Sequence, residues 1–242
     1  MVMGVAYGTT TLHQATRGVV QDGLLLNFDS MVGENTNSSW KNIKGGTDIT
    51  MSNYGGHTKT DAGLIMKLDA SDDQGQIADS SDDYLFSSSA FSVCVWANVV
   101  SVNQGQTSRL IGKARHSNTM AGPVWALQVI GNGSGGSQPQ LNFSGATVDA
   151  GNFTYNTWVY CVGTASGGSG GTSKVYQNAS LKKTATTSFS AQQQAGRPLL
   201  FGSSYGWGPS NFSLACIQIY NKELSAAEVL QNFNAARHRF GI

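Results

Sequence analysis

The sequence predicts an all-β protein, an antiparallel sandwich or barrel that is closed by one C-terminal helix. Short apolar runs recur along the chain with turn-forming residues between nearly every pair. This spacing is typical of antiparallel strands and not of βαβ units. The chain also has 30 glycines among 242 residues and no heptad pattern, which favours many turns over many helices. Only the segment from Leu224 to Ile242 has a helical period.

The C-terminal helix is predicted from its cap. Ser225 stands at the N-cap position with Glu228 three residues later, the spacing of a capping box. Leu224 and Val229 hold the positions of a hydrophobic staple around that cap. We expect one apolar stripe on the helix and basic residues near its C-terminal end, where cations favour the helix dipole. The stripe consists of Ala226, Val229, Leu230 and Phe233, and the basic residues are Arg237, His238 and Arg239, followed by Gly241.

The strands before the helix are predicted from apolar runs that turn formers bound on both sides. Three Gly/Ser-rich stretches, 131–137, 166–173 and 202–210, separate such runs, and we expect them to be loops within one domain. Residues 1–22 are rich in Thr and Gly without periodicity, which predicts either a disordered tail or an N-terminal arm that orders only against a partner. The domain is therefore predicted over 23–242. Its strands are expected at 23–29, 63–69, 83–87, 91–100, 108–113, 123–130, 139–143, 157–165, 173–178, 198–203 and 212–220.

The charge of the chain argues against two classes of partner. Charged residues make up 12% of the sequence, against about 25% in typical proteins. The formal net charge is +1, so electrostatics give no reason to expect nucleic acid or an anionic membrane as partner. The N-terminal residues lack the basic and apolar regions of a signal peptide, and no apolar run has the length of a membrane span. We expect a protein made in the cytoplasm and not inserted into a membrane.

The three cysteines, Cys94, Cys161 and Cys216, each lie inside an apolar, strand-like run. Their number is odd and none belongs to a C-x-x-C pair, which argues against zinc binding and redox chemistry. Free cysteine packs as a small hydrophobic residue. We therefore expect buried, reduced thiols.

Asp79-Ser-Ser-Asp-Asp-Tyr-Leu85 is similar to the turn pattern D-G-x-D-D-Y-I, and Phe91-Ser-Val-Cys-Val-Trp96 is similar to the strand pattern F-T-I-S-A-W that follows it. In these motifs and in their order the chain resembles laminin-G-like, concanavalin-A-like sandwich domains. Four further segments match in the same order. They are Leu110-Ile-Gly-Lys113, the hairpin from Trp158-Val-Tyr-Cys-Val-Gly-Thr164 to Lys174-Val-Tyr-Gln-Asn178, Leu200-Phe-Gly-Ser203, and Ile217 to Phe233.

This resemblance implies a two-sheet antiparallel jelly roll from about residue 23 to the C-terminus. The ending Leu-Ser-Ala-Ala-Glu-Val-Leu-Gln-Asn-Phe-Asn-Ala (224–235) is similar to endings in tailed-phage structural proteins. One departure concerns the hairpin turn, which usually carries Asn-Gly and reads Asn178-Ala179 here. A type I′ turn needs positive φ at both positions, which alanine disfavours. We therefore expect a different loop geometry at this turn.

A cluster of acidic residues makes a calcium site the candidate metal centre. Clustered carboxylates and loop carbonyls supply the six to eight oxygens that Ca²⁺ takes in proteins. The competing explanation is that aspartate is a good turn residue, and no EF-hand spacing is present. No other cofactor is expected. The candidate ligands are Asp72, Asp73, Asp79, Asp82 and Asp83.

A carbohydrate site is predicted in the last Gly-rich loop. Sugars stack on aromatic rings and hydrogen-bond to planar amides, and Tyr205, Trp207 and Asn211 provide both kinds of group within that loop. Trp40 is a further candidate for such a platform. The alternative is that a loop aromatic covers the core or anchors a protein interface.

Hydrolysis is not expected, because a glycosidase needs two carboxylates that flank the scissile bond. The chain has only three glutamates, Glu34, Glu223 and Glu228, and Glu228 is already assigned to the helix cap. The main prediction is a non-enzymatic virion protein of a tailed phage, a homo-oligomeric capsid decoration or other surface protein that binds capsid or tail proteins. The alternative is a glycan-binding adhesin or lectin module that mediates host attachment. A cellular lectin or carbohydrate-active enzyme is the third reading.

Overall fold

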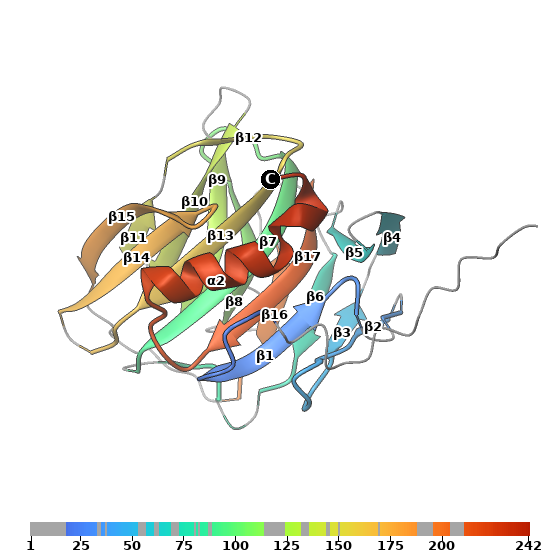
Figure 1. The fold of residues 1–242 in the computed structure, drawn as a ribbon, viewed down its shortest axis with the longest axis horizontal. Coiled ribbons are helices and arrows are strands. Elements are labelled where there is room, and N and C mark those ends of the chain that lie inside the picture. Colours follow the sequence, from blue (N-terminus) through green and yellow to red (C-terminus); the bar gives the residue numbers. More distant parts are fainter. Residues whose placement is uncertain are drawn as a thin grey trace, which may run out of the picture.

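The computed structural model is a two-layer antiparallel β-sandwich with one α-helix on its outside (Figure 1). It describes residues 18–32, 35–36, 38–52, 57–60, 63–68, 73–79, 81, 83–86, 89–113, 124–131, 136–143, 146–149, 151–168, 170–187, 196–203 and 211–242. The predicted fold class is therefore confirmed, and the sandwich alternative is the one observed. Within these residues, no helix is long and apolar enough to cross a bilayer.

The first sheet, called sheet A, carries the helix. Its strands follow the order β15-β14-β13-β7-β17-β5-β4, and β1 pairs with β17 beside this path. The long central strands β7 and β17 are buried along most of their length because one face meets the other sheet and the other face meets the helix. The bounds are β1 Leu24–Asp29, β4 His57–Thr60, β5 Gly63–Leu68, β7 Phe91–Ser101, β13 Trp158–Ala165, β14 Gly171–Gln177, β15 Ser180–Thr187 and β17 Asn211–Tyr220.

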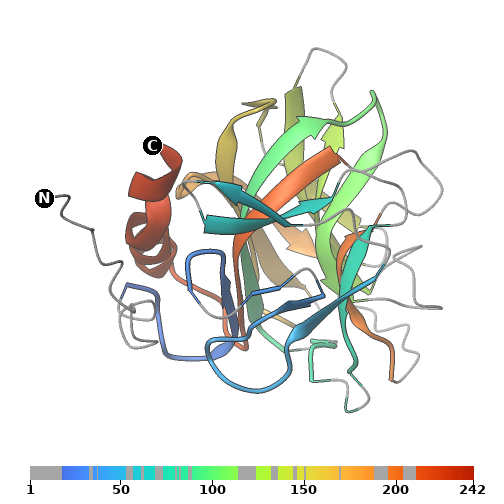
Figure 2. The ribbon, with the colours of Figure 1, turned by 90° about the vertical axis from the view of Figure 1, so that its right-hand side faces the viewer.

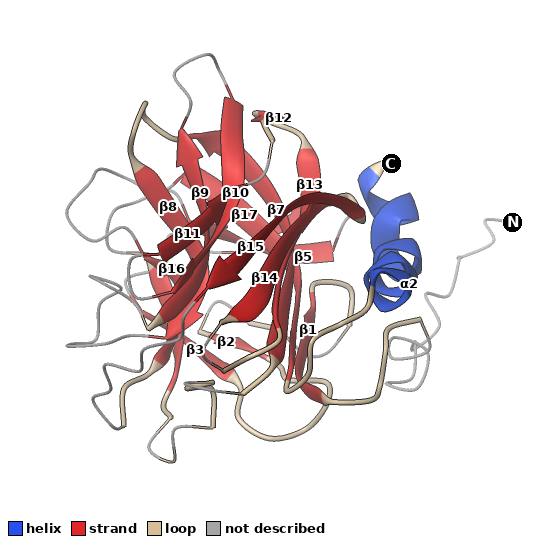
Figure 3. Cartoon of the chain, turned by 90° about the vertical axis from the view of Figure 1, so that its left-hand side faces the viewer, coloured by secondary structure: helices blue, strands red, loops and turns tan. Residues whose placement is uncertain are grey.

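The second sheet, called sheet B, lies on the other side of the core (Figure 3). Its strand order is β11-β10-β9-β8-β16-β6-β3-β2, and β12 pairs with β10. Side chains alternate along most of these strands between the apolar core and the outer face. The strand β8 departs from the alternation at a register shift, where Leu110 and Ile111 both lie in the core. The bounds are β2 Ser39–Trp40, β3 Ile49–Ser52, β6 Gln74–Ile77, β8 Thr107–Lys113, β9 Trp125–Gly131, β10 Gly136–Phe143, β11 Ala146–Asp149, β12 Phe153–Thr154 and β16 Leu199–Ser203.

The helix α2 (Ala226–Ala236) covers the outer face of sheet A and continues into a 3-10 helix, η1 (Arg237–Phe240) (Figure 2). The capping box is present as predicted, since Glu228 N donates to Ser225 Oγ and Ser225 N donates to Glu228 Oε2. Phe233 stacks on Trp96 of β7 with ring centroids 5.6 Å apart. A second apolar cluster thus lies between the helix and the sheet.

The predicted apolar stripe is correct at Val229 and Phe233 and wrong at Leu230 and Ala226. Leu230 is 48% exposed, and Ala226 also faces solvent. The buried positions are Val229, Asn232, Phe233 and Ala236, a spacing of three, four and seven residues that defines one helical face. Asn232 belongs to this face because its amide has buried partners, Val20 N and the Tyr220 hydroxyl.

Two other predictions need correction. Residues 18–22 were assigned to the N-terminal arm, yet Val19 and Val20 are buried against the helix and Tyr220 donates to Val20 O. The packed part of the chain therefore begins before residue 22, and residues 1–17 lie outside the described ones. No strand forms at 83–86, where Asp83 N and Tyr84 N donate to the Asp79 carboxylate and close a turn.

Candidate functional site

The predicted carbohydrate platform is only partly within the described residues. Tyr205 and Trp207 lie outside them. Asn211 is partly exposed and opens β17, where it pairs with Ser101 of β7 in sheet A. Asn211 therefore lies at one end of a central strand of sheet A.

Trp40 does not fit a sugar platform. It is fully buried and its ring stacks on Phe28 at 6.4 Å between centroids. The strand β2 pairs Trp40 with Ile49, which is also in the core between the sheets. A ring without exposed surface offers no face to a sugar, so Trp40 is a core residue.

The acidic cluster is divided between the protein interior and its surface. Asp79 is buried, and its carboxylate accepts hydrogen bonds from Lys113 Nζ, Asp83 N and Tyr84 N. Because these donors occupy both oxygens, Asp79 is committed to a buried ion pair and is not available as a calcium ligand. Asp73 is buried and Asp83 is exposed, accepting from the Ser81 hydroxyl, while Asp72 and Asp82 lie outside the described residues. The described residues contain no group of three His, Cys, Asp or Glu side chains that would hold a metal.

A row of polar side chains crosses the outer face of sheet B, the face opposite the core. On β9, Leu127 and Val129 enter the core, so Gln128 between them points to the opposite face, where it is only 4% exposed. Arg109 of β8 and Gln140 of β10 pair with Gln128 on either side, and Gln128 Nε2 donates to Gln140 Oε1 at 2.9 Å. In-register pairs place these side chains next to one another across the strands. We call Arg109, Gln128 and Gln140 the polar row.

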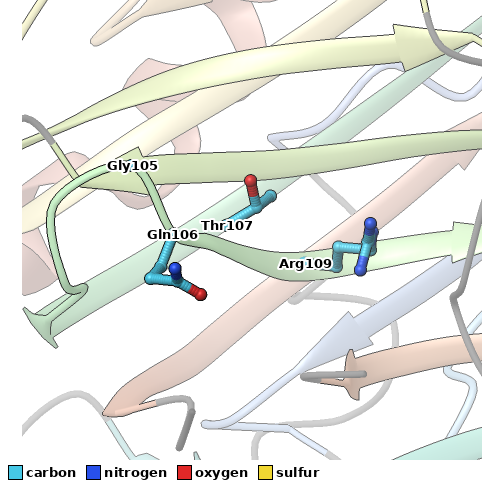
Figure 4. A pocket seen from close by; sticks show the side chains of 4 residues that line it. All are labelled: Gly105, Gln106, Thr107 and Arg109. Atoms are coloured by element: carbon cyan, nitrogen blue, oxygen red, sulfur yellow. The ribbon is translucent and has the colours of Figure 1, made fainter. Parts of the chain in front are cut away.

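A hollow of about 220 Å³ opens beside this row. It is lined by Gly105, Gln106, Thr107 and Arg109, which follow one another from a turn into β8 (Figure 4). Gly105 has a φ of +71°, a left-handed conformation that glycine adopts without steric cost. The turn is held by Gly105 N and Gly131 N, which donate to Gly131 O and Gln106 O respectively. Arg109 is therefore shared by the hollow and the polar row.

Three buried polar atoms of this region have no hydrogen-bond partner. They are Gln106 Oε1, Arg109 Nε and Gln128 Oε1. Leaving a buried donor or acceptor unpaired costs about 1–3 kcal/mol, and unpaired buried groups are rare in native proteins. Burial also lowers the pKa of the Arg109 guanidinium from its ordinary value, because a charge that has lost hydration is less stable. Within the described residues, no carboxylate forms an ion pair with Arg109.

Sequence reasoning missed the polar row because its members are far apart in the chain and lie inside strands. The only local signal is a polar residue inside an apolar run, as Gln128 within Trp125–Gly131, and it does not indicate which residues of other strands lie beside it. One strand that the sequence predicts lies next to the polar row. The strand β16 ends at Ser203, whose backbone pairs with Arg109, and the chain then continues into the segment with Tyr205 and Trp207.

Comparison with solved structures finds the same fold in carbohydrate-related proteins. Trypanosoma rangeli sialidase matches with a TM-score of 0.66 and 13% identity, over 90% of this chain and 33% of that chain. The binding domain of botulinum neurotoxin DC in complex with SialylT matches with a TM-score of 0.63 and 16% identity, over 89% of this chain and 52% of that chain. The chain thus spans about a third of the sialidase and about half of the neurotoxin domain. At these identities the likeness shows the fold alone.

Sequence comparison gives the family. Comparison with curated protein sequences finds no match. A laminin-G-type family model, described as the concanavalin A-like lectin/glucanases superfamily, matches residues 69–230, most of the chain. The match includes β6 to β17 and the beginning of α2, so it contains the sheet B strands that carry the polar row. The chain belongs to the concanavalin A-like lectin/glucanase superfamily.

Proposed function

We propose that the protein is a non-catalytic carbohydrate-binding module whose binding surface is the hollow on sheet B that adjoins the polar row. The observation that carries this proposal is the lining of this hollow, where Gln106, Thr107 and Arg109 bring an amide, a hydroxyl and a guanidinium together (Figure 4). A sugar hydroxyl donates one hydrogen bond and accepts others. A sugar with neighbouring hydroxyls therefore satisfies donors and acceptors of this kind together.

Two similar structures support this choice of ligand class. One is the Trypanosoma rangeli sialidase in complex with sialic acid, with a TM-score of 0.65 and 14% identity. The other is the neurotoxin binding domain in complex with SialylT. These proteins share the fold with this chain, and carbohydrate recognition comes to this chain by analogy. The lining of the hollow supplies the observation on this chain itself.

The absence of catalysis is part of the proposal and rests on the glutamates. Glu223 Oε1 accepts from Lys174 Nζ at 2.7 Å, and Glu228 is held by the helix cap and by Lys222. Both lie at the end of sheet A that carries α2, whereas the polar row is on sheet B. A glycosidase needs two carboxylates about 5–10 Å apart around the bond that it cleaves. Glu34 lies outside the described residues.

The test is a glycan array followed by calorimetry with the oligosaccharides that bind. Gln106→Ala removes the amide that lines the hollow, and we expect it to weaken binding about two- to tenfold, the worth of one hydrogen bond. Thr186→Ala on the exposed strand β15 of sheet A is the matched control, and thermal unfolding verifies that both variants are folded. If the wild-type protein binds no glycan, or if Gln106→Ala binds like the control, the proposed surface is refuted.

Display on a tailed-phage particle, as a homo-oligomer bound to capsid or tail proteins, is the finer part of the proposal. What supports it is the likeness of residues 224–235 to the endings of phage structural proteins. A glycan-binding module on a particle surface would serve attachment to a host. Mass spectrometry of gradient-purified particles tests this role, and absence of the chain from the particles would refute it while leaving carbohydrate binding open to its own test.

A further inference from the structure

We propose that Tyr155 is a positioning residue for the hollow, which sets the affinity for a ligand without touching it. This inference rests on the proposed carbohydrate-binding function and adds a residue that determines affinity to the same site. It follows from the contacts that hold residues 102–106, the connection between β7 and β8. This connection carries Gly105 and Gln106, two of the residues that line the hollow.

The connection has little packing of its own. Residues 103–105 are exposed, and Gly105 has no side chain that could pack. Few buried contacts and an exposed backbone are the features of a segment that opens easily. The position of Gln106 in the hollow therefore depends on groups outside the connection that hold it in place.

Tyr155 holds the connection at its first residue. The Tyr155 hydroxyl accepts a hydrogen bond from Val102 N at 3.1 Å and donates one to Val102 O at 2.6 Å. Val102 is buried, and a buried backbone N–H or C=O without a partner is strongly unfavourable. One hydroxyl thus satisfies both backbone groups of the residue that follows β7.

Tyr155 is itself held by its surroundings. Its ring packs against the apolar core between the sheets, and the next residue, Asn156, donates from its backbone N to Val99 O of β7 at 2.8 Å. Asn156 has a φ of +59°, a left-handed conformation that asparagine tolerates. The loop between β12 and β13 therefore presents the Tyr155 hydroxyl from a support that is attached to β7 and to the core.

Gly131, at the end of β9, holds the connection from another side. Gly105 N donates to Gly131 O and Gly131 N donates to Gln106 O, both at 3.0 Å. A Cβ at position 131 would overlap the carbonyl oxygens of Val102 and Asn103. The backbone of β9 thus approaches the connection to a distance that only glycine permits.

Preorganisation relates these contacts to affinity. A protein whose binding-competent conformation is only partly populated binds with an affinity that is reduced by that fraction. Without the Tyr155 hydroxyl, the connection should populate other conformations in the free protein, and the ligand would have to restore the original one. Neither Tyr155 nor Gly131 is among the described residues that line the hollow, so replacing either one removes no group from this lining.

The experiment replaces Tyr155 with phenylalanine, which keeps the ring and removes only the hydroxyl. Two quantities are measured well below the unfolding temperature: the Kd for the oligosaccharide that binds best on the glycan array, and amide hydrogen exchange at Gly105 and Gln106 in the free protein. A loss of stability alone would leave the Kd of the folded protein unchanged. Gly131→Ala disturbs the same connection from another side, and Tyr84→Phe, which removes a hydroxyl from another ring packed on the core, is the matched control.

We expect Tyr155→Phe to weaken binding about three- to tenfold and to speed exchange at Gly105 and Gln106. Gly131→Ala should show the same two changes, and Tyr84→Phe should show neither. Unchanged affinity in Tyr155→Phe would overturn the inference while carbohydrate binding itself stands. Weaker binding without faster exchange would also overturn it, because the hydroxyl would then act on the ligand directly. Binding of no glycan by the wild-type protein would instead refute the proposed function.

Discussion

The turn between β14 and β15 contains an alanine in a conformation that favours glycine. Asn178 and Ala179 have φ angles of +48° and +62°, and Gln177 pairs directly with Ser180. This is the two-residue turn with positive φ at both positions that hairpins favour, so the expectation of another loop geometry is wrong. Strand pairing on both sides of the turn imposes the conformation on Ala179. Replacing Ala179 with glycine should therefore stabilise the protein.

The expected change in the free energy of unfolding is the sum of one favourable and two unfavourable contributions. Relief of the contact between Cβ and the backbone in the left-handed region gains about 1–2 kcal/mol. Glycine loses more backbone entropy on folding, about 0.5–1 kcal/mol. Ala179 is half-buried against the cluster under the helix, and its methyl group contributes about 0.4 kcal/mol, half the value of a fully buried one. The net stabilisation is about 0.5 kcal/mol.

Asn178→Gly is the matched control, because it places glycine at the other turn position with the opposite expected sign. Asn178 Oδ1 accepts from Tyr160 N at 2.9 Å, and losing this bond costs about 1 kcal/mol, while asparagine tolerates the left-handed region and gains little from the change. Asn178→Gly also loses roughly 0.5–1 kcal/mol of backbone entropy, so the two variants should differ by about 2 kcal/mol, or about 4–8 °C in Tm for a chain of this length. Calorimetry measures the difference. A destabilised Ala179→Gly variant would refute the reasoning.

Three further predictions concern the core. Phe233→Ala should lower the free energy of unfolding by about 3–5 kcal/mol, since the ring is buried on Trp96. Urea unfolding measures this change. Leu230→Ala, at an exposed position on the same helix, should change the free energy of unfolding by less than about 0.5 kcal/mol. Lys113→Met leaves Asp79 buried without its cation, which should lower the free energy of unfolding by about 3–5 kcal/mol. Adding Asp79→Asn removes the unpaired charge and should recover part of this loss of stability. A double variant as unstable as Lys113→Met would contradict the stabilising role of the ion pair. Burial raises the pKa of the Cys94 thiol to about 12 and also raises the pKa values of the Cys161 and Cys216 thiols. All three should therefore resist a thiol reagent at pH 8 and react fully in denaturant, and labelling of the folded protein would show that these thiols are accessible.

The sequence by itself determined the elements whose causes are local. The capping box joins residues three positions apart, so Ser225 and Glu228 predict the start of α2 without any tertiary information. The strands β7, β13 and β17 are continuous apolar runs and were predicted within one residue of their ends. The order of motifs indicated the superfamily for the same reason, because each motif is a short segment read along the chain.

The tertiary structure alone decided which side chains face solvent and which meet across strands. Strands such as β15 and β6 are polar, so their sequences do not predict strands. Pairing with β14 forms β15, and pairing with β3 and β16 forms β6. Trp40 reads as a loop aromatic in the sequence, yet the strand pair with Ile49 brings it into the core. A strand's sequence gives the alternation of its side chains, while the register with its neighbours decides what each one meets.

The polar row shows most clearly the difference between what a local sequence pattern predicts and what strand pairing decides. Arg109, Gln128 and Gln140 belong to three different strands, and no local pattern relates them. They become neighbours because β8 and β10 flank β9, where Gln128 pairs with Arg109 on one side and with Gln140 on the other. Hydrogen bonds between strands join residues that are far apart in the sequence, and no short motif indicates which residues these are. The candidate site could therefore be identified only in the folded structure.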